Sequence, residues 1–307
     1  MKIAALDLGS NSFLCLIAEG DSSGIKKVLQ DVSRIVKLGQ ELEKNGELHP
    51  EALARARLAL SDFKKVINQH SPDRIQAVAT AAVREAKNKQ VFFDLLAEFD
   101  IPVQILSGPE EADISFKGAF SDKSAVITGN QILIDIGGGS TEIVWGQNGG
   151  IKWAQSFPIG VVKLTERFIH QQPFDISKSV QINKFLDQIF DEQLSALHQK
   201  VEDPTLCAVG GTATTLAGVI LGGYDPVKVD GFNLTKEHFE KWIKLFASTS
   251  IEEKKDKYQV GPRAEVILAG CFLLEYLRKY FGRDQVKVSI RGVRYGLALQ
   301  LLKHPGS

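Results

Sequence analysis

Two short segments of the sequence repeat one arrangement of a carboxylate, a glycine and a hydroxyl. One begins at Asp7 and reads DLGSNSF, and the other begins at Asp135 and reads DIGGGSTE. In both, the aspartate ends an apolar run, a glycine follows two residues later and a serine five residues later. Such a loop can turn several backbone N–H groups and a hydroxyl toward one point, which is how a peptide chain binds an oxyanion such as phosphate. The aspartate offers the oxygen ligand that Mg²⁺ prefers. The repeat therefore predicts two related lobes, each with a phosphate-binding loop.

Hairpin turns are the alternative explanation for these two segments. Gly-Ser-Asn and Gly-Gly-Gly-Ser are common turn sequences, and one copy alone would more often be a turn than a binding site. The three consecutive glycines from Gly137 to Gly139 exceed what a turn needs, and the spacing occurs twice. We therefore favour phosphate binding.

A third glycine segment, Gly210–Thr212, lies between an expected strand and an expected helix. A helix N-terminus in that position could bind an anion, although close packing of a small-residue helix against the sheet explains the glycines nearly as well. No lysine follows the glycines, so the segment is not a P-loop, and neither glycine cluster fits G-x-G-x-x-G. A dinucleotide-dependent oxidoreductase is therefore disfavoured.

The composition is that of an ordinary globular enzyme. In 307 residues, Lys plus Arg and Asp plus Glu both total 37, so the overall charge gives no indication of nucleic-acid or membrane binding. No apolar run reaches the roughly 18 residues of a membrane helix, and Asp7 interrupts the first apolar run, which argues against a signal peptide. Cys15, Cys207 and Cys271 lie far apart in apolar stretches, which is typical of buried reduced thiols in a cytoplasmic protein.

The expected elements place each glycine segment beside a strand. Helical spacing predicts a helix from Pro50, Thr80 is expected to cap a helix that runs to about residue 99, and Pro109 begins another. The polar stretch Ser121–Ser124 is the expected junction of two domains, 1–122 and 123–307, and the charged run Lys254–Lys257 is expected to be a solvated face. Strands are expected at 3–6, 13–18, 25–29, 75–79, 103–106, 132–136, 142–145, 151–154, 206–209 and 286–290, and further helices at 162–170, 177–199, 213–221, 236–246, 264–281 and from 293.

Together these segments resemble the exopolyphosphatase/guanosine pentaphosphate phosphohydrolase family, within the actin-like and sugar-kinase-like ATPase superfamily. The resemblance covers nearly the whole chain, and its motifs are highly specific in combination and order. It implies an α/β fold of two ribonuclease-H-like lobes with mixed five-stranded sheets and an active site in the cleft between them. The motifs that carry it are Asp7–Phe13, Thr80–Asn88, Ser107–Ala112, Asp135–Glu142, Gly160, Gly210–Thr212 and Arg263–Glu265.

The resemblance also implies roles for individual side chains. Glu111 matches the glutamate that activates water, and Arg84 matches the phosphate-contacting arginine. From spacing alone, Glu110 and Glu111 would only offset the positive end of a helix, and Arg84 would be a surface residue. The two carboxylates that flank the second loop could likewise only cap the turn. The implied Mg²⁺ ligands are Asp135, Glu142 and Asp7, and the implied phosphate-binding residues are Ser10, Asn11, Ser12, Gly137, Gly138, Gly139, Ser140, Thr141, Gly210, Gly211 and Thr212.

The activity that the resemblance implies is release of terminal orthophosphate from linear polyphosphate by Mg²⁺-dependent attack of water. Guanosine pentaphosphate is the alternative substrate, because it presents the same terminal phosphoryl group. Mn²⁺ in place of Mg²⁺, a monovalent cation such as K⁺ and a homodimer are further alternatives that the sequence leaves open. Three other functions also remain open: a kinase of the same superfamily, a sensor that binds the alarmone or a nucleotide without catalysis, and a polymerising actin-like protein.

Two features depart from the family. Residues 291–296 read RGVRYG where members often show GLREG, so Arg294 matches but Tyr295 replaces an acidic residue and takes no charged role from the resemblance. Longer relatives continue with a helical, metal-dependent-phosphohydrolase-like domain that helps to grip long chains. We therefore expect this chain to prefer shorter polyphosphates or nucleotides.

Overall fold

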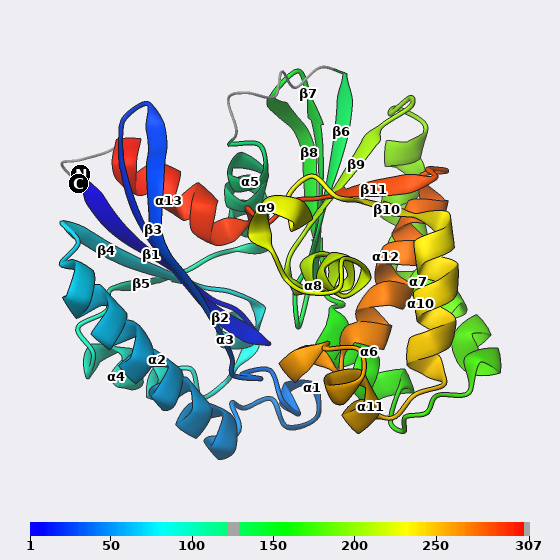
Figure 1. Cartoon of the computed structure of the whole chain (residues 1–307), viewed down its shortest axis with the longest axis horizontal. Coiled ribbons are helices and arrows are strands. Elements are labelled where there is room, and N and C mark those ends of the chain that lie inside the picture. The colour runs from blue at the N-terminus through cyan, green and yellow to red at the C-terminus, as the bar shows by residue number, and fades with distance from the viewer. Residues whose placement is uncertain (122–128, 304–307) are drawn as a thin grey trace. The chain divides into compact units, whose positions relative to one another are not determined.

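The computed structural model of the chain describes residues 1–121 and 129–303. The chain forms two compact units: unit 1 contains residues 1–124 and 291–307, and unit 2 contains residues 125–290. Each unit is built on one mixed sheet (Figure 1). The expected junction, Ser121–Ser124, lies outside the described residues except for Ser121. The expected second domain, 123–307, differs at its far end, because the segment from Arg291 packs in unit 1.

Unit 1 has a five-stranded sheet in the order β3-β2-β1-β4-β5. The first three strands form an antiparallel meander, and β4 and β5 continue the sheet in the direction of β1. Its elements are β1 (Lys2–Leu8), β2 (Ser12–Asp21), β3 (Gly24–Ile35), α1 (Leu42–Asn45), α2 (Pro50–His70), β4 (Arg74–Ala79), α3 (Ala81–Glu85), α4 (Gln90–Ala97), β5 (Val103–Ile105), α5 (Gly108–Ala119) and α13 (Val293–Lys303).

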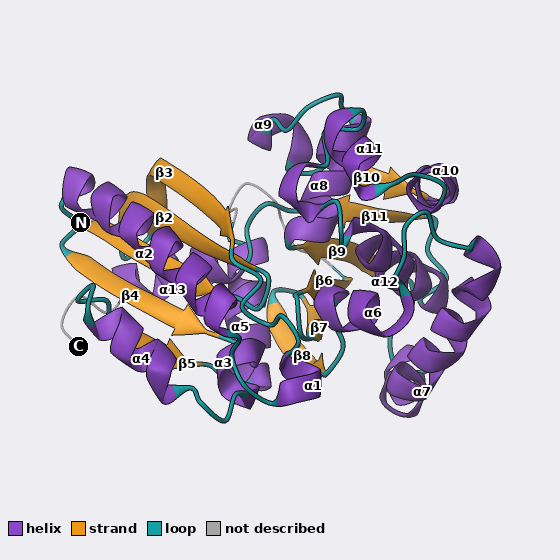
Figure 2. Cartoon of the chain, turned by 90° about the horizontal axis from the view of Figure 1, so that it is seen from below, coloured by secondary structure: helices purple, strands orange, loops and turns teal. Residues whose placement is uncertain are grey.

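The side chains of β1 alternate between the two faces of this sheet, as the pleat of a strand requires. Ala4, Leu6 and Leu8 pack with α2 and α4 on one face, and Ile3 and Ala5 pack with α5 and α13 on the other. Figure 2 shows α2 and α4 together on the first of these faces. The sheet is covered on both faces, which leaves the loops at its strand ends as the places where a ligand can bind.

Helix α13 is held in unit 1 by a backbone contact and by an ion pair. A Cβ atom at Gly296 would collide with the carbonyl oxygen of Ile114, so α13 crosses α5 with main chain against main chain. Gly118 of α5 makes the reciprocal close contact with α13. Arg294 donates two hydrogen bonds of 2.8 Å to the Asp31 carboxylate of β3. These contacts, together with the apolar packing, explain why the last helix belongs to unit 1.

Asp31 also supplies a carboxylate beside Tyr295. The Tyr295 hydroxyl donates to Asp31 across 3.4 Å. Burial, and then the charge of Asp31, raise the pKa of Tyr295 to about 12. Tyr295 is therefore a neutral donor that supports the ion pair between Asp31 and Arg294.

Unit 2 repeats the strand order of unit 1. Its sheet runs β10-β11-β9-β6-β7-β8, in which β6, β7 and β8 form the antiparallel meander and β9 and β11 are parallel to β6. The predicted duplication and fold class are thus confirmed, although a short edge strand, β10, gives the second sheet six strands rather than five. The elements are β6 (Asn130–Ile136), β7 (Thr141–Gln147), β8 (Gly150–Phe157), α6 (Val161–Phe168), η1 (Ile176–Lys178), α7 (Ser179–His198), β9 (Thr205–Val209), α8 (Gly211–Ile220), α9 (Pro226–Val229), β10 (Asn233–Thr235), α10 (Lys236–Ala247), α11 (Ile251–Asp256), η2 (Gly261–Arg263), α12 (Ile267–Tyr280) and β11 (Gln285–Val288).

The core of unit 2 lies between this sheet and helices α6, α7, α8, α10 and α12. Ile132, Ile134 and Ile136 share one face of β6 and pack into one apolar cluster with these helices. Phe190 of α7 and Phe246 of α10 are fully buried in it. Within the described residues, no helix is both long enough and apolar enough to cross a bilayer.

The single helix expected from Thr80 to about residue 99 is wrong, because the chain forms α3 and α4 with a break between them. The Thr80 side chain makes no capping bond, and Ala86 turns to an extended conformation (φ −69°, ψ 132°). Asn88 explains the break, since its side chain accepts from the Leu48 N–H (2.8 Å) and donates to the Leu48 carbonyl (3.2 Å). The Lys87 N–H likewise donates to the Gly46 carbonyl at 2.9 Å and not to a carbonyl of α3.

The three cysteines are buried and form no disulfide, as the sequence predicted. Burial is the main cause that raises the pKa of Cys15 and of Cys207 to about 12. Both thiols are therefore neutral near pH 7, and neither offers a nucleophile.

Candidate active site

The two repeated segments fold into the same hairpin loop. The N–H of Gly9 donates to the Ser12 carbonyl at 3.1 Å, and the N–H of Gly137 donates to the Ser140 carbonyl at 3.0 Å. The register also agrees, because the aspartate of each loop pairs with the residue seven places later. In the second loop that partner is Glu142, so two carboxylates face each other across adjacent strands there.

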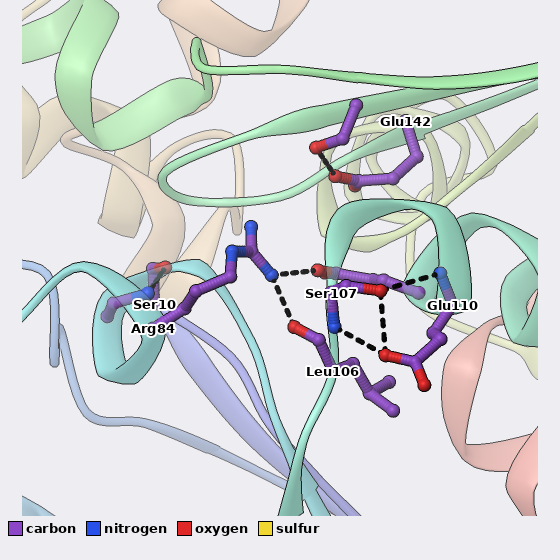
Figure 3. A network of polar contacts seen from close by, with 9 residues as sticks. Ser10, Arg84, Leu106, Ser107, Glu110 and Glu142 are labelled. Atoms are coloured by element: carbon purple, nitrogen blue, oxygen red, sulfur yellow. Dashed lines mark hydrogen bonds and ion pairs between the residues drawn. The ribbon is translucent and has the colours of Figure 1, made fainter.

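Bonds to neighbouring segments hold the first loop in place. The Ser10 hydroxyl, which is buried, accepts from the N–H of Ala82 at 3.1 Å and so caps α3 (Figure 3). The carbonyl of Ser10 accepts from the N–H of Gly39. The carbonyl of Asn11 accepts from the N–H groups of Val36 and Lys37, the two residues after β3, each at 3.0 Å. The Ser10 hydroxyl links the loop to the helix that carries Arg84, and because it accepts in this bond it still has a proton to donate to the phosphate that it was expected to contact.

The side-chain amide of Asn11 differs from the rest of this loop. Its Nδ2 atom is buried and, among the described residues, has no hydrogen-bond partner. Buried polar groups are nearly always paired, so this N–H₂ group can donate to a water molecule or to a ligand. The neighbouring Ser12 begins β2 and is half-buried.

The second loop is held through its carbonyl groups. The first turn of α6 donates to it, from Val161 to the Gly137 carbonyl at 3.0 Å and from Val162 to the Gly138 carbonyl at 2.9 Å. A Cβ atom at Gly160 would lie 2.5 Å from both carbonyl oxygens, which explains the glycine before α6. Because these bonds are made to carbonyl groups, they do not use the backbone N–H groups from Gly138 to Ser140.

The Thr141 hydroxyl was expected to hold a phosphate oxygen, and the structure gives it another role. It donates to the Ile159 carbonyl at 2.6 Å, and the residue is fully buried. The side chain therefore stabilises the end of the loop. Ser140, one residue earlier, is also buried.

Asp135 and Glu142 are the carboxylates beside this loop. Glu142 is 1% exposed and accepts a hydrogen bond of 2.6 Å from the hydroxyl of Ser156, its partner on β8. Asp135 lies over Gly210, because a Cβ atom there would come within 3.1 Å of Asp135 Oδ1. Gly210 also has a φ of 86°, which other residues rarely adopt. The paired oxygen donors suit Mg²⁺, and no group of three or more His, Cys, Asp or Glu side chains in residues 1–121 and 129–303 is arranged to hold a metal ion.

The third glycine segment begins a helix, as the sequence predicted. Gly210 is the N-cap of α8, and Gly211 is its first residue. The guanidinium group of Arg263, in η2, lies so close to Gly211 that a Cβ atom there would collide with it. The side chain of Thr212 turns away and packs against Gly270 of α12. Backbone amides and one arginine are thus the positive groups at this helix end.

Two adjacent glutamates at the start of α5 have different roles. Glu110 forms a capping box with Ser107: its carboxylate accepts from the Ser107 N–H at 2.8 Å, and its own N–H donates to the Ser107 hydroxyl (Figure 3). The Ser107 hydroxyl also donates to this carboxylate at 2.7 Å, and this bond, followed by the bond from the Ser107 N–H, lowers the pKa of Glu110. Glu111 is 6% exposed, and its carboxylate lies 3.2 Å from Nη1 of Arg84. Both glutamates lie in the first turn of α5, as the spacing predicted, but only Glu110 caps the helix.

Arg84 connects α3 to the start of α5. Its Nη1 atom donates to the Leu106 carbonyl at 2.7 Å as well as to Glu111 (Figure 3). Leu106 directly follows β5, so this arginine fixes the end of the strand from which the helix with Glu111 begins. In the described part of the chain, these bonds leave Nε and Nη2 without a protein acceptor.

The structure therefore groups the predicted residues within each unit. Unit 1 brings Glu111 and Arg84 together and links the Ser10 loop to α3. Unit 2 brings Asp135 beside Glu142 and Gly210. Sequence reasoning missed the contacts of Ser156 and Arg263. Arg263 belonged to a recognised motif, but the sequence assigned it no role. The contact of Ser156 with Glu142 could have been predicted only from the pairing of β7 with β8.

Comparisons with known proteins identify the family of this chain. The Ppx/GppA phosphatase family profile matches residues 16–304. Exopolyphosphatase 2 of Mycobacterium tuberculosis is 32% identical, and the match covers 98% of each chain. The crystal structure of the Aquifex aeolicus member of the Ppx/GppA family is 30% identical, with a TM-score of 0.78 over 100% of this chain and 99% of that one. An exopolyphosphatase from Cytophaga hutchinsonii is 26% identical, with a TM-score of 0.89 over 98% of each chain. The chain therefore belongs to the Ppx/GppA phosphatase family.

Proposed function

We propose that this chain is an exopolyphosphatase that hydrolyses the terminal phosphoanhydride bond of linear polyphosphate and releases orthophosphate. The observation that carries the proposal is that the adjacent residues Glu110 and Glu111 make different contacts. Because Glu110 caps α5, the adjacent Glu111 is left as a buried carboxylate held by an arginine. A helix N-terminus without a catalytic role would need only Glu110, the glutamate of the capping box. The relative named exopolyphosphatase 2 supports the choice of substrate.

Glu111 would act as the general base. A carboxylate in hydrogen-bond reach of a water molecule can orient the water for in-line attack and accept its proton. Arg84 would hold the Glu111 carboxylate in place through the contact of 3.2 Å. The guanidinium has five N–H donors, and those on Nε and Nη2 would stabilise charge on the transferred phosphoryl group.

Each unit contains donors that would suit a phosphate group. Asn11 Nδ2 is the donor in unit 1, because it is buried without a protein partner among the described residues. In unit 2 the donors would be the amides from Gly138 to Ser140 and the N-terminus of α8 with Arg263. A helix N-terminus and a run of glycine amides both favour anions.

Asp135 and Glu142 would hold a Mg²⁺ ion in unit 2. When bound, such an ion neutralises charge on the phosphate oxygens. The hydroxyl of Ser156 fixes Glu142 in the orientation that this role requires. Mn²⁺ accepts the same oxygen ligands.

Guanosine pentaphosphate is the second candidate substrate. The family name includes both activities, and the terminal phosphoryl group is the same in both compounds. The deciding experiment measures orthophosphate release from tripolyphosphate, from longer polyphosphates, from guanosine pentaphosphate and from ATP, each with and without Mg²⁺. We expect the highest kcat/KM for a polyphosphate. Transfer of phosphate from ATP to a sugar or carboxylate, in place of release, would contradict the proposal.

A further inference from the structure

Lys254 is a fully buried lysine in α11. Its neighbours Glu253 and Lys255 are exposed, so the expectation of a solvated charged face holds around Lys254 but is wrong for that residue. Its ammonium group donates to the Thr249 carbonyl at 2.6 Å and to Oε1 of Gln172 at 2.6 Å. No carboxylate of the described residues lies within ion-pair distance of this group. Burial therefore lowers the pKa of Lys254 to about 8, and the fold keeps a costly charge here.

The bonds of Lys254 reach both ends of one short segment. Its carbonyl accepts from the N–H of Val260 at 3.0 Å, directly before η2. Its ammonium group holds Gln172, whose Nε2 donates to the Glu265 carbonyl at 2.8 Å, shortly after η2. One buried residue thus fixes the chain on both sides of the turn that carries Arg263.

An amide side chain suits both bonds of this link at position 172. Lysine donates and cannot accept, and a carbonyl oxygen accepts and cannot donate. Gln172 meets both needs, with Oε1 toward Lys254 and Nε2 toward Glu265. A carboxylate of the same size would keep the first bond and lose the second.

The turn held by these bonds carries Arg263 to the start of a helix. Arg263 lies against Gly211, the first residue of α8. Backbone amides at a helix N-terminus and a guanidinium group are both donors that suit a phosphate oxygen. The bonds on both sides of η2 hold the arginine at this helix end.

We propose that Lys254 and Gln172 are positioning residues, which hold Arg263 at the N-terminus of α8 for contact with a phosphate of the substrate. The role of Arg263 in this inference rests on the proposed function. The clamp itself, from Lys254 through Gln172 to Glu265, rests on the geometry alone.

The test compares Gln172→Glu with Lys254→Met and Arg263→Ala. Gln172→Glu keeps an acceptor for Lys254 and removes the donor to Glu265. We expect it to raise the KM for tripolyphosphate by about fivefold to tenfold, the effect of one lost hydrogen bond. Its kcat should stay within about twofold. Its Tm should not fall, because Lys254 gains a charged partner. Lys254→Met should raise KM similarly with a lower Tm, Arg263→Ala should raise it at least as much, and the exposed control Lys255→Met should leave both KM and Tm unchanged.

Hydrogen exchange supplies a readout that does not depend on activity. Amides of residues 261–266 should exchange faster in Gln172→Glu than in the wild-type protein, and those of α10 should not change. Unchanged exchange at 261–266 would refute the clamp even if no phosphate compound were hydrolysed. If Arg263→Ala raises KM and neither Gln172→Glu nor Lys254→Met does, the positioning role is wrong and the proposed function stands. An unchanged KM in Arg263→Ala would show that Arg263 does not contact a phosphate of the substrate.

Discussion

Arg84 donates from one nitrogen atom to both the Glu111 carboxylate, at 3.2 Å, and the Leu106 carbonyl, at 2.7 Å. This arginine therefore sets the position of the proposed base relative to the strand that precedes it. Glu110, one residue before the base, is held by Ser107 instead. The two glutamates provide a natural pair for mutagenesis, because they are adjacent and differ in their contacts.

Glu111→Gln should lower kcat for orthophosphate release by about 10²–10⁴-fold, because an amide cannot accept the proton of the attacking water. The KM should change little, since the base does not bind the phosphate chain in the ground state. Steady-state kinetics on tripolyphosphate measures both. The matched control is Glu110→Gln, in which glutamine can still complete the capping box, so kcat should remain close to that of the wild-type protein. An equal loss of kcat in both variants would show that the substitutions disrupt helix α5, and it would contradict the role of Glu111 as the base.

Asn11→Asp should weaken substrate binding without unfolding unit 1. The substitution keeps the size of the side chain and replaces the buried donor Nδ2 with a carboxylate oxygen, which repels phosphate. We expect the KM to rise by at least about tenfold, because donors to charged groups contribute about 1.5–3 kcal/mol. Asn68→Asp, on the exposed side of α2, changes the net charge equally and should have no effect. A wild-type KM in Asn11→Asp would mean that the unpaired amide does not contact the substrate.

Glu142→Gln should raise the Mg²⁺ concentration needed for half-maximal activity. Loss of one charged oxygen ligand weakens a hard cation site, and we expect a shift of more than about tenfold. Ser156→Ala removes the hydrogen bond that orients Glu142 and should give a smaller shift in the same direction. Titration of activity with Mg²⁺ after treatment with a chelator measures both shifts. Glu192→Gln, an exposed change on α7, is the control, and full activity in the presence of the chelator would exclude the metal from the mechanism.

Gly296→Ala should destabilise unit 1. The added methyl group would collide with the Ile114 carbonyl, where α13 crosses α5, and overpacking of this kind costs about 1–3 kcal/mol. Thermal unfolding should show a lower Tm, and activity should fall with the fraction folded because α5 carries Glu111. Gly150→Ala is a suitable control, since its nearest neighbour would be at 3.7 Å. A wild-type Tm in Gly296→Ala would show that the two helices can separate without cost.

The parts of the fold that the sequence predicted depend on local spacing. The offsets from Asp7 to Ser12 and from Asp135 to Ser140 determine a hairpin register, and the structure has the same loop bond in both. The different roles of Glu110 and Glu111 could also have been foreseen, because Ser107 followed three residues later by glutamate is a capping-box pattern.

The parts that the sequence did not predict depend on contacts between distant residues. The burial of Lys254 follows from Gln172, which lies 82 positions earlier. The break before α4 follows from Asn88 and the backbone of Leu48. The packing of α13 in unit 1 requires Asp31 and Arg294, which are 263 positions apart. Periodicity and propensity describe a chain segment by itself, so they carry no information about such partners.

The return of the chain to unit 1 at Arg291 has a consequence for synthesis on the ribosome. Ile3 and Ala5 need α13 to cover them, yet translation must first produce residues 125–290 of unit 2. At about 5–20 residues per second, that takes roughly 10–30 seconds. During this interval the nascent polypeptide presents an uncovered apolar sheet face, whereas unit 2 emerges uninterrupted and can complete its core first.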